Sequence, residues 1–418
     1  MKRAFLWIVL AGFFVSCGYN NSSPGSGGTT SGLKFRAFVA QSVSSGLSAS
    51  SLIIVDASKD VLARVAGIGA ATAGVGRSPV LMDVSPNKNL TLVYSSGDNL
   101  FALVNNSTEQ VSGSVTLSGP TESFTISSDN ASAYVAIPTA PVNGHPPGAL
   151  QVISLGNGVA TSTVPIPAVR FLSESHDGNR ILAFSDNSDS IGVVIPANIG
   201  TTIDPLTFIG GFDRPVGALY SSDDRLAYVL NCGAECGGTS ASIQTVDMTT
   251  TPPALVGLPI PVPAATIGLL NGTTLYVAGS PPATPCTTGG ASSCGAITVV
   301  DVSGGAVLAS AEITDGYHNR IGMGADGQLF IGARTCSQVL PPATETRGCL
   351  SIFNTTTSAV TIPSFNGDVT GIEPITNRHV VYVAQGGELK IYDTTTDALQ
   401  TQQVDIFGFA SDVKLVDF

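Results

Sequence analysis

The clearest pattern in the chain is a strand-turn-strand unit at residues 377–393, NRHVVYVAQGGELKIYD. β-Branched and aromatic side chains fill residues 380–383, and a second short apolar segment covers residues 389–392. The Gly386-Gly387 dipeptide between them is a two-residue connection of the kind that closes tight hairpins. We therefore predict a β-hairpin here, preceded by a polar turn and ended by Asp393.

The same unit recurs along the chain at a nearly constant interval. Each copy begins with a turn centred on a small polar residue, and successive turns lie 42, 48, 46, 48, 55 and 51 residues apart. These turn residues are Asn87, Asp129, Asp177, Asp223, Asn271, Asp326 and Asn377. The apolar segments are short and lack helical periodicity, and each copy has room for four of them. A period of this size predicts the blades of an all-β propeller rather than the coils of a solenoid.

The two ends of the pattern complement each other. Residues 35–40, 52–55 and 61–65 supply the second, third and fourth strands of a first blade that lacks an innermost strand. Residues 413–416 form an innermost strand with nothing after it. Joining the two would close the ring and remove the open sheet edge. We therefore predict a single propeller over residues 34–418 with eight four-stranded blades, or seven if one irregular unit has been counted twice.

Several of these segments resemble one known repeat. Residues 326–331 (DGQLFI), 274–278 (TLYVA) and 297–301 (ITVVD) resemble the YVTN type of β-propeller repeat, in a degenerate form that covers about 380 residues. That family includes secreted and surface-layer proteins, and propellers similar to it include lactonases. The resemblance implies the fold, but the function of such propellers varies too widely to be transferred.

The composition fits this reading and excludes one class of partner. Only 11% of the residues are charged, and 43% are apolar, which allows a large core. The formal net charge is −12, and it becomes −14 if Lys2 and Arg3 are removed with residues 1–16. Such a surface repels phosphate backbones, so we expect no nucleic-acid partner.

The first residues indicate where the protein works. A short basic start is followed by an apolar run over residues 4–15, which matches a signal peptide (1–16) and is too short to span a bilayer comfortably. The segment ending at Cys17 resembles a bacterial lipobox, although Phe14 stands where the family usually has Leu. The resemblance implies a lipidated Cys17, and Gly18 after it favours the outer membrane. Residues 17–33 then form a flexible linker. The alternative is an ordinary secretory signal.

Six further cysteines fall into three close pairs. The pairs are Cys232 with Cys236, Cys286 with Cys294, and Cys336 with Cys349. Fifteen pairings are formally open, but each of these pairs lies between the second and third strands of its own repeat. Oxidising surroundings outside the cytoplasm favour local disulfides. The alternative is a zinc or redox centre, but three residues separate the first pair where structural zinc sites commonly have two, so we expect no metal.

Two recurrent residue types have structural explanations. Aspartates end several third strands, where such residues usually cap their own turns. They are Asp56, Asp247, Asp301 and Asp393. Aromatic residues recur at one position of the second strand, where we expect them to pack between blades. They are Tyr134, Tyr228, Tyr276, Phe330 and Tyr382.

No catalytic motif occurs in the sequence. HExxH, GxSxG and P-loop patterns are missing, the four histidines lie in different repeats, and we expect neither catalytic residues nor a cofactor. One weaker set of charged residues lies near the starts of the innermost strands, where convergence at the channel mouth would make a ligand pocket. The set is Glu122, Arg170, Arg214, His318, Arg320, Asp368 and Asp412. The alternative is a solvated rim of partly paired charges.

These features lead to three functional hypotheses. The first is a lipid-anchored propeller of the bacterial cell envelope, periplasmic or surface-facing, whose disulfide-stiffened loops bind an envelope protein or glycan. The second is a lactonase-like hydrolase that uses Arg214 and His318 at the channel mouth. The third is a structural surface component that associates with itself.

Overall fold

The computed structural model describes residues 30–417 with gaps at 43–50, 66, 69–73, 283–285, 287–293, 338, 341–344 and 347. The predicted signal peptide, Cys17 and most of the predicted linker lie outside the described residues. Within the described part of the chain, no helix has both the length and the apolar character that a membrane crossing requires.

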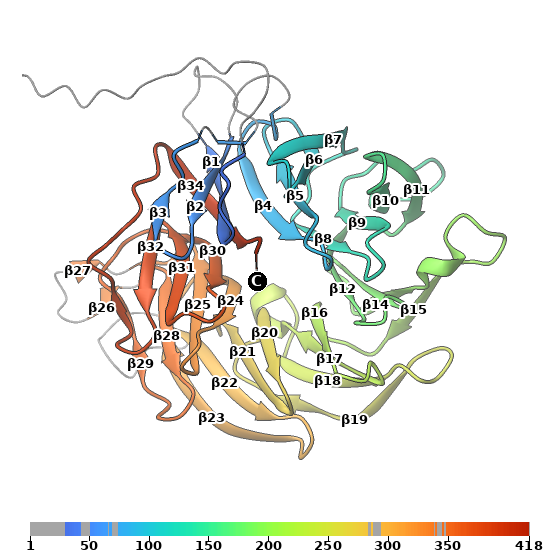
Figure 1. Ribbon diagram of the computed structural model, residues 1–418. Helices are drawn as coiled ribbons and strands as arrows, with labels where there is room; N and C mark the ends of the chain where they lie inside the picture. Colours follow the sequence, from blue (N-terminus) through green and yellow to red (C-terminus); the bar gives the residue numbers. More distant parts are fainter. Residues whose placement is uncertain are drawn as a thin grey trace, which may run out of the picture.

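The described strands form eight four-stranded blades around a central channel, as predicted (Figure 1). The blades are numbered here along the chain, and the innermost strand of each is given first. Blade 1 contains β34 (Phe409–Leu415), β1 (Arg36–Ser42), β2 (Ser51–Asp56) and β3 (Val61–Leu62); blade 2 contains β4 (Pro79–Val84), β5 (Leu90–Ser95), β6 (Leu100–Asn105) and β7 (Gln110–Thr116); blade 3 contains β8 (Ser123–Ile126), β9 (Ser132–Ile137), β10 (Ala149–Ser154) and β11 (Val159–Pro165); blade 4 contains β12 (Val169–Glu174), β13 (Ile181–Ser185), β14 (Ser190–Val194) and β15 (Leu206–Gly210).

The second half of the ring repeats this plan with longer insertions. Blade 5 contains β16 (Pro215–Tyr220), β17 (Leu226–Asn231), β18 (Ser242–Asp247) and β19 (Ala254–Pro261); blade 6 contains β20 (Ile267–Asn271), β21 (Thr274–Gly279), β22 (Gly295–Asp301) and β23 (Ala306–Ile313); blade 7 contains β24 (Tyr317–Met323), β25 (Gln328–Arg334), β28 (Leu350–Asn354) and β29 (Val360–Thr361); blade 8 contains β30 (Val369–Pro374), β31 (Val380–Gln385), β32 (Glu388–Asp393) and β33 (Ala398–Leu399). The insertions hold the short hairpin β26 (Val339–Leu340) and β27 (Glu345–Thr346), and the 3-10 turn η2 (Gly233–Cys236). A further 3-10 turn, η1 (Pro196–Asn198), lies between β14 and β15 of blade 4.

The ring closes in blade 1, which confirms the prediction from the two ends of the sequence. β34 pairs with β1 in antiparallel register, with Ala37 opposite Leu415 and Val39 opposite Val413. In Figure 1 the red C-terminal strand lies beside the blue N-terminal strand. Closure leaves no innermost strand of the eight sheets without its partner.

The hydrophobic core is a series of layers between neighbouring blades. Side chains alternate across each middle strand, so both faces of a blade are buried. In β9, Val135 packs toward Phe101 of blade 2, while Tyr134 packs toward Ile181 of blade 4. The five recurrent aromatic residues of the second strands are all buried in such layers, as predicted.

Side chains of the turns explain why the repeat is marked by polar residues. The predicted caps are present: Asp247 accepts the backbone N–H of Thr249 at 2.8 Å, and Asp56, Asp301 and Asp393 accept the equivalent N–H groups. A second motif was not anticipated. In blades 2 to 5, a serine hydroxyl donates to the Asn or Asp two residues later at 2.6 to 2.9 Å. These serines are Ser85, Ser127, Ser175 and Ser221.

Turns after the innermost and third strands lie on one face of the ring, called here the turn face. The opposite face, called the loop face, carries the loops between second and third strands and the connections between blades. The first residues of seven innermost strands therefore surround the channel on the loop face, and β34 contributes the eighth.

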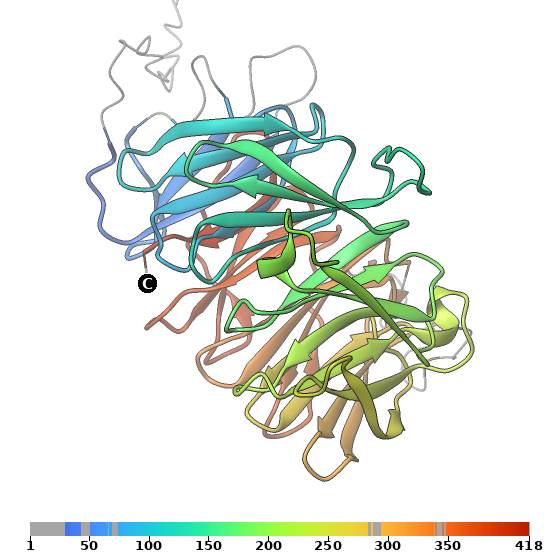
Figure 2. The same cartoon turned by 90° about the vertical axis from the view of Figure 1, so that its right-hand side faces the viewer.

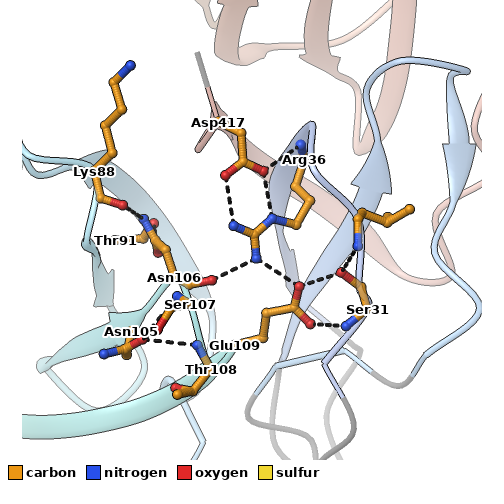
Figure 3. Close-up of polar contacts among 11 residues, drawn as sticks. Ser31, Arg36, Lys88, Thr91, Asn105, Asn106, Ser107, Thr108, Glu109 and Asp417 are labelled. Atoms are coloured by element: carbon orange, nitrogen blue, oxygen red, sulfur yellow. Dashed lines mark hydrogen bonds and ion pairs between the residues drawn. The ribbon is translucent and has the colours of Figure 1, made fainter.

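A buried ion cluster fastens both chain ends on the turn face (Figure 3). Arg36 donates from Nε and Nη2 to Asp417 at 2.6 and 2.8 Å, and from Nη1 to Glu109 at 2.8 Å. The same Nη1 donates to the Asn106 carbonyl at 2.7 Å, and Ser31 hydrogen-bonds to Glu109. Arg36 is only 8% exposed. Hydrogen bonding to Asp417 raises the pKa of Arg36 despite its burial.

A second pair joins blades 8 and 1 along the channel wall. The Lys414 ammonium lies 3.8 Å from the Glu373 carboxylate, which also accepts the N–H of Leu415 at 3.1 Å. Burial raises the pKa of Glu373 to about 7, and the Lys414 charge acts in the opposite direction. The ion cluster of Arg36 and the Glu373–Lys414 pair are together called the closure seam.

The three disulfides form with the predicted partners. Cys232 bonds Cys236 in blade 5, Cys286 bonds Cys294 in blade 6, and Cys336 bonds Cys349 in blade 7. Each lies between the second and third strands of its blade, and so on the loop face. Figure 2 shows the ring from the side, with the C-terminus labelled at the left.

Candidate functional site

Two adjoining cavities open at the loop face of the channel. The channel cavity, about 300 Å³, is bordered by the innermost strands of blades 4 to 7. The rim cavity, about 430 Å³, lies beside it over blades 4 and 5. Glu122, Phe171, Val216 and Tyr317 line both. A further cavity of about 400 Å³ opens toward the turn face beside His176 and Tyr220.

β-Bulges aim polar side chains into the mouth. The pairing of β12 with β13 skips Arg170, and the pairing of β24 with β25 skips Asn319. The innermost strands β4, β16 and β30 carry the same irregularity near their first residues. A bulge turns the extra residue away from the ladder and locally increases the twist. The bulges therefore bring Arg170 and Asn319 to the cavities, whereas the residue skipped in β4 and β16 is a valine.

Arg170 is held by two carboxylates. Its Nε and Nη2 donate to Asp186 at 2.6 and 2.5 Å, which is a bidentate pair, and Nη1 donates to Glu122 at 3.1 Å. Hydrogen bonding to Asp186 raises the pKa of Arg170 above its ordinary value. The Arg170 guanidinium is therefore held in place at the rim cavity, and the two carboxylates neutralise its charge.

Arg214 is less completely paired. It precedes β16, its Nη1 lies 3.6 Å from the Asp189 carboxylate, and it lines the rim cavity. Its buried Nε has no hydrogen-bond partner among the described residues. A φ of 55° places its backbone in the left-handed region, which is uncommon for a residue with a side chain.

Arg320 and Arg334 face the channel cavity without an ion-pair partner in the described chain. Arg320 donates to the carbonyls of Thr370 and Asn319 at 2.7 and 2.9 Å. Arg334 donates to the Asn319 side-chain oxygen from Nε and Nη2 at 2.8 and 2.6 Å, with the amide oriented as its surroundings require. Burial is the main cause that lowers the pKa of Arg320.

Tyr317 lines both the channel cavity and the rim cavity. Burial raises the pKa of its phenol to about 12, and the nearby Glu122 and Glu235 carboxylates add to this effect. The phenol therefore stays protonated at neutral pH and can donate a hydrogen bond into the cavity.

Of the seven residues predicted to form a pocket, the structure brings four to the mouth. Glu122, Arg170, Arg214 and Arg320 line the cavities described above. The other three are not among the lining residues. The sequence prediction in turn omitted Tyr317, Asn319, Arg334 and Asp186. Arg334 ends a second strand, and such strands also end at the loop face, so the same topological argument could have found it.

The three remaining residues have structural contacts. His318 is completely buried, and burial lowers its pKa to about 4, so it is neutral at physiological pH. Asp412 accepts the N–H groups of Met82 and Val413 at 2.8 and 2.9 Å. Asp368 accepts the N–H of Thr335 at 2.7 Å beside the Cys336–Cys349 loop. Among the described residues, no group of three or more His, Cys, Asp and Glu side chains is placed to hold a metal ion.

Comparison with known proteins supports the fold. No family model matches the chain, and no curated protein sequence matches it. The structure is similar to "Dihydro-heme d1 dehydrogenase NirN in complex with DHE", with a TM-score of 0.63 and 13% identity over 92% of this chain and 75% of that one. It is also similar to the hydrazine synthase of Kuenenia stuttgartiensis, with a TM-score of 0.51 and 16% identity over 71% of this chain and 90% of that one. At these identities the likeness shows a shared propeller fold and nothing about activity.

Proposed function

We propose that this protein is a lipid-anchored binding protein of the bacterial cell envelope that captures an envelope protein or a glycan on its loop face. The observation that carries the proposal is the placement of all three disulfides on the loop face of three successive blades, the face on which the two cavities open. Cys236 itself lines the rim cavity. Stiffened loops lose less conformational entropy on binding, so this bracing favours recognition. The resemblance to YVTN repeats supports the same setting, because that family includes secreted and surface-layer proteins.

The test is capture of partners from envelope extracts and on glycan arrays. Paired Cys→Ala variants of each braced loop, Cys232/Cys236 first, should keep the propeller fold and reduce capture at least about tenfold, as for the loss of a binding hot spot. Shortening the unbraced loop at residues 141–147 of blade 3, which lies on the same face, is the matched control and should leave capture intact. Unchanged capture in all three cysteine variants would refute the proposal.

The proposed anchor has a separate test. Cys17→Ser should release the protein from the membrane fraction, since the thiol that would carry the lipid is gone. A protein that stays in the soluble fraction with Cys17 intact would instead support the ordinary secretory signal.

A lactonase-like hydrolase is the alternative, and the convergence of Glu122, Arg170 and Tyr317 at one cavity is the observation that favours it. His318 lies in the core, so such an enzyme would need another base. A lactone screen with the parent protein and the Arg214→Ala variant tests this alternative. No turnover by the parent retires this alternative.

A further inference from the structure

Arg320 and Arg334 are the arginines that line the channel cavity. Three described arginines away from this cavity lack an ion pair: Arg64, Arg180 and Arg225. Five described arginines have a carboxylate oxygen within 4 Å: Arg36, Arg77, Arg170, Arg214 and Arg378. Arg320 and Arg334 have none among the described residues, although both border the channel cavity. Guanidinium groups taken out of bulk water are normally paired. No carboxylate of the described chain therefore pairs with these two charges, and a bound anion could do so.

The nearest acidic residues are already engaged. Asp412 contributes an attractive charge to Arg320, but its oxygens accept two backbone N–H groups. Glu122 is within hydrogen-bond distance of Arg170. Arg334 adds a like charge that, with burial, lowers the pKa of Arg320. An anion bound between the two guanidinium groups would relieve both effects.

The unused N–H donors of the Arg320 and Arg334 guanidinium groups suit an acceptor with two oxygen atoms. Arg320 uses Nε and one N–H of Nη1 on carbonyls, and Arg334 uses Nε and one N–H of Nη2 on Asn319. Each guanidinium, with five N–H donors, keeps donors for one more acceptor. Tyr317 can add a third donor. A carboxylate, with one oxygen for each arginine, fits this number of donors better than a phosphate does.

Much of the remaining lining of the channel cavity is apolar. Leu172, Val216, Leu219 and Ile267 come from blades 4, 5 and 6, together with the polar Ser173 and Thr266. A cavity of about 300 Å³ accommodates a small organic molecule rather than a polymer. The ligand therefore needs an anionic end and an apolar body.

We propose that the channel cavity binds a small organic acid, with its carboxylate between Arg320 and Arg334 and its apolar body against blades 4 to 6. This goes beyond the proposed capture of a protein or glycan, because it assigns a separate small-molecule site on the same face. The chain carries a net charge of −12, so discrimination in favour of an anion has to come from these local charges.

The test is isothermal titration of the intact protein with 3-phenylpropionate and with its neutral amide. The acid should bind and the amide should bind at least about tenfold more weakly, because a charge-assisted bidentate contact is lost. Arg334→Gln should weaken acid binding by a similar factor, and raising the NaCl concentration should weaken it further. Arg77→Gln, which changes an exposed arginine outside the cavity, is the matched control and should bind as the parent does.

Arg320→Lys is a second variant that keeps a charge but loses the planar fork, so acid binding should fall while the protein stays folded by circular dichroism. Equal binding of acid and amide, or acid binding unaffected by Arg334→Gln, overturns the proposal. So does a dissociation constant for the acid above about 10 mM. Loss of macromolecular capture in the disulfide variants with acid binding retained would separate the two proposals, because these variants leave both arginines in place.

Discussion

The closure seam and the channel mouth use the same side-chain chemistry with opposite outcomes. In the seam, Arg36 is buried, and its Nε, Nη1 and Nη2 atoms all donate to a carboxylate or a carbonyl oxygen. At the mouth, Arg320 and Arg334 are half-buried and meet only neutral acceptors. The difference lies in location: the seam fills the spaces on both sides of blade 1, whereas the mouth borders a cavity. A paired charge between blades fixes the ring, whereas an unpaired charge at a cavity is available to a ligand.

This contrast predicts that substitutions in the two regions separate stability from binding. Seam variants should lower the free energy of unfolding and leave acid binding per folded molecule unchanged. Mouth variants should do the reverse. The predictions below test the separation, beginning with the largest effect on stability.

Arg36→Ala should be the most destabilising single substitution of those considered. It leaves the Glu109 and Asp417 carboxylates without their cation in a buried site, which typically costs about 3–5 kcal/mol. Urea unfolding followed by circular dichroism measures the change. Arg77→Ala removes an ion pair whose arginine side chain is 73% exposed, and it should cost less than about 1 kcal/mol. Equal effects of the two substitutions would show that the seam contributes no more than a surface pair.

The disulfides of the loop face should contribute according to the length of chain that each closes. Replacing both cysteines by alanine should cost about 2 kcal/mol for the Cys232–Cys236 pair and about 3 kcal/mol for the Cys336–Cys349 pair, because the longer loop restricts the unfolded chain more. Their sequence separations are 4 and 13 residues. Urea unfolding gives the order, and intact mass should increase by six hydrogens on full reduction of the parent. A larger loss for the shorter loop would instead indicate that contacts of the folded state dominate.

Glu235→Gln should change the pH dependence of stability near the mouth. Burial raises the pKa of Glu235 from 4.5 to about 7, and the N–H of Ser280 at 2.8 Å only partly offsets this. Because the folded state binds the proton more tightly, this contribution to stability is complete below about pH 4.5 and is lost as the pH rises through 7. The glutamine variant should therefore gain about 1–2 kcal/mol relative to the parent between these pH values.

The control for that measurement is an exposed carboxylate. Glu388→Gln changes a side chain that is 70% exposed and removes one surface ion pair, so it should change the unfolding free energy by less than about 1 kcal/mol. A curve for Glu235→Gln that stays parallel to that of the parent would mean that the Glu235 carboxylate is solvated in solution.

Local sequence signals were sufficient to predict the architecture. The spacing of the polar turns predicted the blades, and the incomplete ends predicted closure of β34 on β1, because each signal repeats or complements another. The disulfide partners followed from the repeat for the same reason. The Ser-x-Asp turn motif was also present in the sequence and was overlooked.

The mouth was predictable only in part, because its geometry depends on bulges that leave no clear sequence signal. Strict alternation along β24 would place His318 and Arg320 on the same side. The bulge at Asn319 separates them, so that His318 enters the core and Arg320 faces the cavity. The ion cluster of the seam could not be predicted from the sequence either, because Arg36 and Asp417 are 381 residues apart in the chain.

The attachment of Ser31 to Glu109 also sets the direction in which the molecule would point. This contact lies on the turn face, so the described chain begins on the side of the ring opposite the mouth of the channel and rim cavities. An anchor attached to the chain before Ser31, as proposed above, would place the turn face toward a bilayer and the channel mouth toward the aqueous compartment.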